Sequence, residues 1–221
     1  NIQPDIIIHT AAISKPDECE TNRPHCLLHN VEATKHLLNA HAATKANEKL
    51  FIFTSTDFIF GENGPHNEDD IPSPLNFYGE SKLLAEEAVK NSGLDHAIVR
   101  PVFIYGEAWE GLRPSFLHWV KNNLEAGKHI KVVADQWRTP TFVQDICRGI
   151  RNIILRQKKG AYHLAGKDIL SPFQMAVKTA QVLGLDETLI EPVTADTFPE
   201  PVKRAKRSGL HITKAIKELK Y

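Results

Sequence analysis

Residues 73–87 read SPLNFYGESKLLAEE and place Tyr78 and Lys82 four positions apart. If this stretch is helical, both side chains project from the same face, about one turn from each other. A lysine cation close to a phenol favours the phenolate, so it lowers a pKa that starts near ~10 and makes proton transfer at neutral pH practical. The spacing predicts a tyrosine that acts as a general acid or base, although a solvated tyrosine and lysine on a surface helix share the same spacing.

An apolar stretch that ends in hydroxyl groups precedes this helix. Residues 50–57 read LFIFTSTD, the pattern of a buried parallel strand with polar side chains at its carboxyl end. Catalytic groups of open α/β sheets gather at that edge. A hydroxyl there can donate a hydrogen bond to a substrate carbonyl oxygen as negative charge develops on it, but it can also be an ordinary cap.

The composition of the 221 residues is typical of a globular protein, with 42% hydrophobic and 24% charged residues. Lys plus Arg and Asp plus Glu are both 27, so the net charge of zero indicates neither a nucleic-acid partner nor an anionic membrane. The sequence contains no apolar run of about 18 residues that predicts a membrane span, and no signal-peptide pattern. Its three cysteines form no paired framework, which favours a reducing, cytoplasmic location.

A metal site is the alternative use of the cysteines. His25, Cys26 and His29 fall within one helical turn. A tetrahedral site also needs a fourth ligand and partners that orient the imidazole rings, and the sequence shows no second cluster. We therefore predict no metal site.

Strands alternate with helices along the chain, a pattern that predicts a Rossmann-like, doubly wound parallel α/β sheet covered on both faces. Strands are expected at residues 6–12, 50–57, 96–101, 130–133 and 161–164. Helices are expected at residues 22–42, around Tyr78 and on to about residue 91, at 114–126 and at 171–183, with a further helix capped by Asp145. We expect residues 1–106 and about 137–160 to form a partial cofactor-binding domain, and about 107–136 and 161–221 a smaller α+β substrate-binding domain.

Five motifs occur in a characteristic order: HTAA at 9–12, NVEAT at 30–34, STDFIFG at 55–61, YGESK at 78–82 and RPVFIYG at 100–106. This series resembles the extended short-chain dehydrogenase/reductases. The Ser-Thr-Asp form of the hydroxyl motif, together with DQWRTPT at 135–141, is most similar to the dTDP-4-dehydrorhamnose reductase family. The resemblance covers nearly the whole chain.

The resemblance implies a set of site residues. The catalytic residues it implies are Thr56, Tyr78 and Lys82. The residues implied to bind the cofactor are Ala11, Ala12, Ile13, Tyr78 and Lys82. The residues implied to contact the substrate are Thr56, Asp57, Phe103 and Arg138. On residue type alone, Phe103 could equally be a plain core residue and Arg138 a solvated loop residue.

Two further features have alternatives that the sequence leaves open. Asn30 lies inside an expected helix, where the resemblance implies a structural role near the catalytic lysine and where an exposed polar residue is the alternative. The basic stretch at 203–210 could be mistaken for a nucleic-acid patch. The zero net charge argues against that, and the resemblance implies a segment close to the substrate.

The activity implied by the resemblance is NADPH- or NADH-dependent reduction of a 4-keto nucleotide sugar, as in dTDP-rhamnose biosynthesis. The expected partner is the nucleotide-sugar substrate, with no nucleic acid, no membrane and a possible homodimer. Relatives of the same superfamily catalyse epimerisation or dehydration instead. The chain also resembles the regulatory beta subunit of methionine adenosyltransferase, so a non-catalytic role is a second alternative.

One expected element of this fold is missing from the sequence. A dinucleotide-binding fold normally begins with a strand, a Gly-rich turn and a helix that receives the pyrophosphate, and the 221 residues contain no such element. The sequence begins at Asn1 and its single methionine is Met175. We therefore expect further residues before Asn1, and we expect the strand around Ile7 to be the fourth of a larger sheet, beside its first strand.

Overall fold

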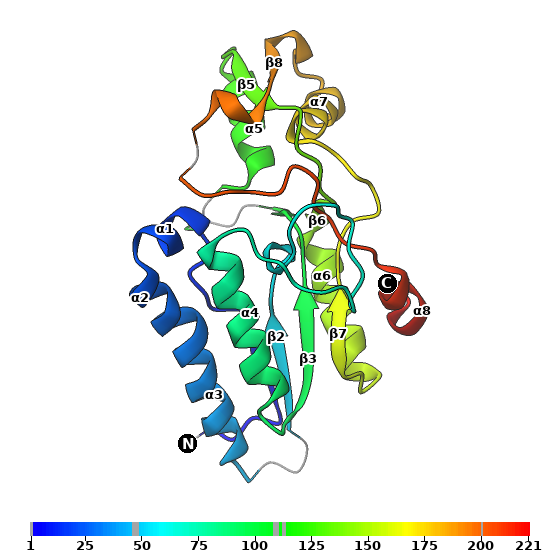
Figure 1. Cartoon of the computed structure of the whole chain (residues 1–221). Coiled ribbons are helices and arrows are strands. Elements are labelled where there is room, and N and C mark those ends of the chain that lie inside the picture. Colours follow the sequence, from blue (N-terminus) through cyan, green and yellow to red (C-terminus); the bar gives the residue numbers. More distant parts are fainter. Residues whose placement is uncertain (1, 46–48, 108–110, 112–113, 200) are drawn as a thin grey trace.

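Four parallel strands form the main sheet of the computed structural model, which describes residues 2–45, 49–107, 111, 114–199 and 201–221. The strands lie in the order β1 (Ile6–His9), β2 (Leu50–Thr54), β3 (Asp95–Arg100) and β7 (Gly160–His163). Their register places Ile52 of β2 between Ile8 of β1 and Ala97 of β3. Because all four strands run the same way, their carboxyl ends meet at one edge, which points upward in Figure 1.

One face of the sheet is covered by the helices of the N-terminal half (Figure 1). These are α1 (Pro16–Thr21), α2 (Arg23–Leu27), the π-helical turn η1 (Leu28–Glu32), α3 (Ala33–Ala42) and α4 (Phe77–Lys90). Side chains of alternate strand positions, such as Phe51, Phe53 and Ile98, point toward this layer. They form a core with Leu38 of α3 and Val89 of α4.

The opposite face is covered by α6 (Val143–Leu155) and α8 (Thr213–Leu219). The intervening strand residues Ile52, Ala97 and Val99 form a second core there. Ile153 of α6 and Leu219 of α8 complete that core, and all five side chains have no exposed surface. The alternation of apolar residues on both faces explains why the strands read as continuous apolar runs.

A second layer lies beyond the carboxyl edge of the main sheet, at the top of Figure 1. It contains α5 (Phe116–Glu125), β5 (Ile130–Val133), α7 (Pro172–Leu183), the 3-10 turn η3 (Glu187–Leu189), β8 (Ile190–Val193) and the 3-10 turn η4 (Ala195–Thr197). Strands β5 and β8 pair in parallel. The layer has its own core, formed by Val120, Leu124, Ile130, Val132, Ala176, Ala180 and Ile190. The short strands β4 (Ile104–Tyr105) and β6 (Thr141–Phe142) also pair in parallel.

The predicted parallel α/β architecture is confirmed, and several local expectations are corrected. The expected helix at 22–42 is divided into α2, the π-helical turn and α3, and α1 precedes it. Helix α6 begins at Val143 with Phe142 as its N-cap, so Asp145 lies in the first turn and is not the cap. The predicted Ser171 cap of α7 is confirmed, because its side chain accepts a hydrogen bond from the Gln174 backbone N–H.

Strand β7 lies at the boundary expected between the two domains. It pairs with β3 in the main sheet, and α8 packs in the same core as Tyr162 of β7. Residues 160–163 and 213–219 therefore lie with the main sheet, although the sequence analysis assigned most of them to the substrate-binding region.

Strand β1 is the end strand of the main sheet within the described residues. Ile7 packs in the core beneath α3 and α4, whereas Ile6 and Ile8 on the other face are 37% and 46% exposed. No helix in the described ranges is both long and apolar enough to cross a membrane.

Candidate active site

The carboxyl end of β2 and the first turn of α4 form the centre of the candidate site. Thr56 follows β2 in extended conformation and caps the 3-10 turn η2 (Asp57–Ile59), accepting a hydrogen bond from the Phe58 backbone N–H at 3.2 Å. Asn76 caps α4 and accepts from the Gly79 N–H at 3.0 Å. Tyr78 therefore lies in the first turn of α4, and Lys82 follows on the same face one turn later.

Gly79 allows α4 to lie directly on η2. A Cβ atom at Gly79 would be 2.1 Å from the carbonyl oxygen of Phe58, a distance that no side chain can have. The Phe58 and Tyr78 rings meet edge to face, with centroids 5.5 Å apart. The glycine between Tyr78 and Lys82 thus brings the phenol to Thr56.

Tyr78 is 8% exposed, and burial raises its pKa above the ordinary value for a phenol. A hydrogen bond with Thr56 opposes the shift, and the nearby Asp57 carboxyl adds to it. We expected the Lys82 cation to lower the pKa of Tyr78, and that direction is wrong, because burial raises it. The raised pKa keeps the phenol protonated at neutral pH, which is the form that a proton donor needs.

Lys82 is 2% exposed and lies beneath the end of β2. Its Nζ donates a hydrogen bond to the carbonyl oxygen of Thr54 at 2.8 Å and lies 4.1 Å from the centre of the Phe53 ring. Burial lowers the pKa of Lys82 to about 8, although the Glu86 carboxylate acts in the opposite direction. The amine therefore changes protonation close to neutral pH.

Asn30 ties the loop after β1 to α4. Its Oδ1 accepts from the Ile13 N–H at 2.8 Å, and its Nδ2 donates to the Ile13 carbonyl at 3.1 Å and to Ser81 Oγ at 3.0 Å. Ser81 Oγ in turn donates to the carbonyl of Tyr78 at 2.8 Å. Asn30 is 1% exposed, so the exposed alternative is wrong, and its bonds go to Ile13 and Ser81.

The three residues expected to line the cofactor all lie in this loop. Ala11 is exposed, and Ala12 and Ile13 are half-buried. Small side chains at the end of β1 leave its backbone accessible to a ligand. The Ile13 backbone is held through Asn30 to the helix that carries Tyr78 and Lys82.

Asp57 and Arg138 come together at a second part of the site. Asp57 is 7% and Arg138 also 7% exposed. Burial raises the pKa of the Asp57 carboxyl, while the Arg138 charge and the neighbouring Ser208 hydroxyl oppose the shift. These residues line a small cleft of about 20 Å³ together with Phe58, Phe60, Leu75, Asn76, Arg204 and Ala205.

Phe103 lies beneath Arg138, whose guanidinium carbon is 5.5 Å from the ring centre. The backbone of Phe103 has a φ of 39°, a conformation that non-glycine residues rarely adopt and that clusters at functional sites. Arg138 donates to Gln136 Oε1 at 2.6 Å. The solvated-loop alternative for Arg138 is therefore wrong.

A larger cavity of about 540 Å³ extends from Phe103 and Arg138 toward the second layer. Its walls combine aromatic rings with basic side chains: Phe103, Phe116, Trp119, Phe198, His129, Lys131, Arg138 and Arg204. Aromatic rings can stack on a planar ring of a ligand, and adjacent guanidinium groups can bind phosphates joined to that ring. An even larger hollow of about 820 Å³ borders α5, α6 and α7. Thr56, Tyr78 and Lys82 line neither this hollow nor the cavity of about 540 Å³.

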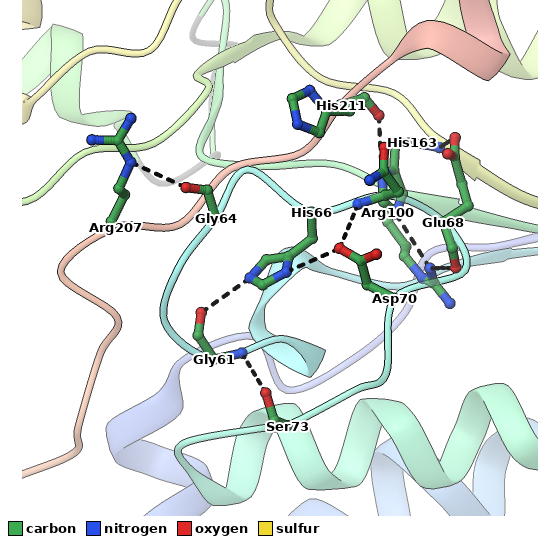
Figure 2. A network of polar contacts seen from close by, with 11 residues as sticks. Gly61, Gly64, His66, Glu68, Asp70, Ser73, Arg100, His163, Arg207 and His211 are labelled. Atoms are coloured by element: carbon green, nitrogen blue, oxygen red, sulfur yellow. Dashed lines mark hydrogen bonds and ion pairs between the residues drawn. The ribbon is translucent and has the colours of Figure 1, made fainter.

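The C-terminal segment that carries Arg204 and Ser208 is held by the loop at residues 61–73, and Figure 2 shows part of these contacts. Arg207 Nε donates to the Gly64 carbonyl at 3.1 Å, and the Gly64 N–H donates to the Arg207 carbonyl at 3.0 Å. The backbone of His66 bonds to Gly209 and to His211 in the same way. Sequence reasoning did not identify Arg204 and Ser208 as site residues; its one signal was the basic stretch.

Among the described residues, no group of three or more metal-ligating side chains is placed to hold a metal ion. His25 and His29 do lie together, with ring centroids 4.4 Å apart. Cys26 points away from them into the core.

The fold and the motifs define the class of protein: a Rossmann-like α/β protein of the extended short-chain dehydrogenase/reductase type. The chain belongs to the RmlD substrate binding domain family, whose model matches residues 1–220. The predicted resemblance is confirmed.

Among solved structures, the chain is similar to the dTDP-4-dehydrorhamnose reductase of Bacillus anthracis in complex with NADP. The TM-score is 0.89 at 28% identity, over 98% of this chain and 74% of that chain. Among curated proteins, it is 32% identical over 218 residues to the probable low-salt glycan biosynthesis reductase Agl14 of Haloferax volcanii, covering 97% of this chain and 72% of that protein.

Methionine adenosyltransferase 2 subunit beta of Bos taurus is equally similar, at 32% identity over 214 residues and 94% of this chain. The chain spans 62% of the length of that relative.

Proposed function

We propose that this chain functions as a reductase that uses NADPH or NADH to reduce a 4-keto nucleotide sugar. The observation that carries the proposal is that Thr56, Tyr78 and Lys82 are all buried near the carboxyl end of β2, where the Thr56 hydroxyl acts on the Tyr78 phenol and Lys82 Nζ is bonded to the Thr54 carbonyl. A carbonyl reduction needs a proton donor and a hydrogen-bond donor at the same oxygen. Tyr78 and Thr56 supply both.

The residues at the end of β1 fit a nicotinamide cofactor. Ala11 is exposed and has a small side chain, and the Ile13 backbone is already fixed through Asn30. When bound, the cofactor supplies the hydride. We propose that Ala11, Ala12 and Ile13 contact it and that Lys82 holds its ribose hydroxyls.

In the reaction, Tyr78 donates its phenolic proton to the substrate carbonyl oxygen. Thr56 Oγ1 stabilises the negative charge that develops on that oxygen. Lys82, with a pKa of about 8, is protonated in a large share of molecules at neutral pH and stabilises the phenolate that Tyr78 leaves behind.

The cavity of about 540 Å³ supports a nucleotide sugar as substrate. We propose that Arg138 and Arg204 bind the diphosphate, that the aromatic rings of Phe116 and Trp119 contact the base, and that Asp57 contacts the sugar. The similarity to the dTDP-4-dehydrorhamnose reductase of Bacillus anthracis favours this substrate class.

We also propose that the two layers bind different ligands. The main sheet with α1–α4, α6, α8 and β7 binds the cofactor, and the layer of α5, β5, α7 and β8 binds the nucleotide. This assignment retains the two expected domains. It places β7 and α8 in the cofactor-binding domain, because both elements pack in the core of the main sheet.

Replacement of Tyr78 by phenylalanine tests the activity. Removing the proton donor should lower kcat by about 10²–10⁴-fold and leave NADPH affinity within a factor of about two. The assay follows NADPH oxidation with a dTDP-4-keto-6-deoxyhexose, and cofactor binding is measured separately by fluorescence titration. Tyr105→Phe is the matched control, since Tyr105 lines the hollow away from the site. Unchanged kcat in Tyr78→Phe would rule out Tyr78 as the donor.

The similarity to the methionine adenosyltransferase beta subunits favours a second candidate, a regulatory subunit. This candidate predicts cofactor binding without turnover of any 4-keto nucleotide sugar, and binding to a methionine adenosyltransferase catalytic subunit. Gel filtration of the mixed proteins and the same NADPH assay separate the two functions.

A further inference from the structure

Two cysteines lie in direct contact behind the candidate active site. The Sγ atoms of Cys19 in α1 and Cys26 in α2 are 2.7 Å apart, and both side chains have no exposed surface. They form one core cluster with Tyr78, against which Ile13, Phe58 and Phe77 pack. Both thiols are free in this structure.

The geometry leaves little to move before the two sulfurs can bond. A disulfide needs an S–S distance of about 2.05 Å, so the sulfurs have to approach by only a fraction of an ångström. Helices α1 and α2 meet at Asn22, whose side chain caps α2, and this bend turns Cys19 toward Cys26. Asn30 Nδ2 lies 3.3 Å from Cys26 Sγ and holds it in place.

We propose that Cys19 and Cys26 form an oxidation site, at which a reversible disulfide bond locks α1 to α2 against the core around Tyr78. The oxidant is a small-molecule disulfide such as oxidised glutathione. The two protein thiols lose two electrons in total, and the small disulfide gains them.

The bond forms in two exchange steps. One protein thiolate attacks a sulfur of the small disulfide, which breaks its S–S bond, forms a mixed disulfide and releases one small thiol. The second protein thiolate then attacks the protein sulfur of the mixed disulfide and releases the second small thiol. The two protons of the protein thiols end on the two released thiols.

Access to the buried thiols requires local opening of α1 and α2. These helices have six and five residues, and Cys19 and Cys26 are their only buried side chains. Segments with few buried apolar contacts open locally at small free-energy cost. Burial also raises the pKa of Cys19, so exchange in the closed state is slow and opening sets the rate.

Intact mass spectrometry after equilibration with oxidised glutathione tests the proposal. The Cys147→Ser variant removes the exposed third thiol and isolates the buried pair. We expect a mass decrease of about 2 Da for the loss of two hydrogens, reversed by dithiothreitol. Cleavage after Glu20 separates Cys19 from Cys26, so the two peptides should stay joined until the sample is reduced.

Cys19→Ser/Cys147→Ser and Cys26→Ser/Cys147→Ser are the matched variants, and neither should lose the two hydrogens. The oxidised Cys147→Ser protein should melt about 5 °C higher than its reduced form, because the bond restricts the unfolded chain. If Cys147→Ser keeps its full mass in oxidised glutathione while unfolded Cys147→Ser loses two hydrogens, the folded protein does not form the bond. Such a result would overturn the proposal. Neither readout needs the proposed reductase activity.

Discussion

Burial shifts the pKa values of Tyr78 and Lys82 in opposite directions, although the two residues lie one turn apart on the same helix. Both shifts favour the neutral form of the side chain. The free-energy cost of removing the charged form from water is larger than the stabilisation that nearby groups give to that charge. The phenol keeps its proton and the amine loses its proton more easily. The neutral phenol is the form that the proposed proton donor needs.

Lys82 makes the stability of the protein depend on pH. Its pKa is about 8 in the native protein and near ~10.4 in an unfolded chain. Between these values the unfolded chain binds one proton more, so the free energy of unfolding rises with pH. Relative to Lys82→Met, which cannot titrate, the wild type should gain about 2–3 kcal/mol between pH 8 and about pH 10.

Urea unfolding of both proteins across this pH range measures the gain. The comparison stops near ~10 because the raised pKa of Tyr78 lowers stability above the ordinary phenol pKa in both proteins. Parallel curves for the wild type and Lys82→Met would contradict a lowered pKa for Lys82.

The loop at residues 61–73 is the element that positions the proposed substrate side of the site. The Glu62 carboxylate accepts hydrogen bonds from the backbone N–H groups of Lys206 at 3.0 Å and Arg207 at 3.2 Å. These bonds hold the segment that carries Arg204 and Ser208. The proposed diphosphate site thus depends on a loop that need not touch the substrate.

Glu62→Ala should raise the KM for the nucleotide sugar by about tenfold and change kcat much less, because it removes charge-assisted bonds that position a binding segment. Steady-state kinetics with NADPH measures the two constants separately. Glu62→Gln, which keeps an acceptor oxygen, should recover part of the loss, and Glu87→Ala on the exposed side of α4 is the control. A tenfold fall in kcat with an unchanged KM would show that Glu62 does not act through substrate binding.

At the scale of the whole molecule, Arg100 joins the parts that surround the carboxyl edge of the sheet. It lies at the end of β3 and forms two hydrogen bonds with Glu86 of α4, at 2.9 Å and 2.8 Å. Its Nη1 also donates to the Glu68 carbonyl and contacts His163 Nε2 at 3.2 Å, as part of the network in Figure 2. Burial and the Arg100 charge lower the pKa of His163 to about 3, so this imidazole is a neutral acceptor.

Removing one partner of the buried pair should be costly. Glu86 is 0% and Arg100 is 2% exposed, so Glu86→Gln leaves the Arg100 charge buried without its carboxylate. We expect a loss of about 3–5 kcal/mol in the free energy of unfolding, and a clearly smaller loss for the apolar double variant Glu86→Leu/Arg100→Met. Urea unfolding measures both, with Glu87→Gln as the control. If the double variant loses as much as or more than Glu86→Gln, packing and not charge dominates this site.

Sequence patterns predicted most of the main elements because each pattern reports a local property. Residues 50–57 combine a continuous apolar run with terminal hydroxyls, and β2 with Thr56 lies there. The Ser171 cap was equally local. Strand β8 and helix α8 were not predicted, since their stretches have weak periodicity and are stabilised by pairing with β5 and packing on β7.

The candidate site likewise combines features that local sequence predicts with features that depend on tertiary packing. The YGESK motif identified Tyr78 and Lys82, but the direction of the Tyr78 pKa depends on how completely the fold buries the phenol and on Asp57 beside it. Arg204 and Ser208 lie about 150 residues from Asp57 along the chain, and no spacing rule connects them.

By itself, the sequence determined the parallel α/β class and the family, and it supplied the candidate catalytic motif, because apolar periodicity and motif order are properties of neighbouring residues. Only the tertiary structure decided that Cys19 contacts Cys26 behind Tyr78 and that Arg204 and Ser208 reach Asp57. It also decided the pKa of each buried group. These features depend on the packing of distant segments and on the water that packing removes, neither of which is encoded at any fixed spacing along the chain.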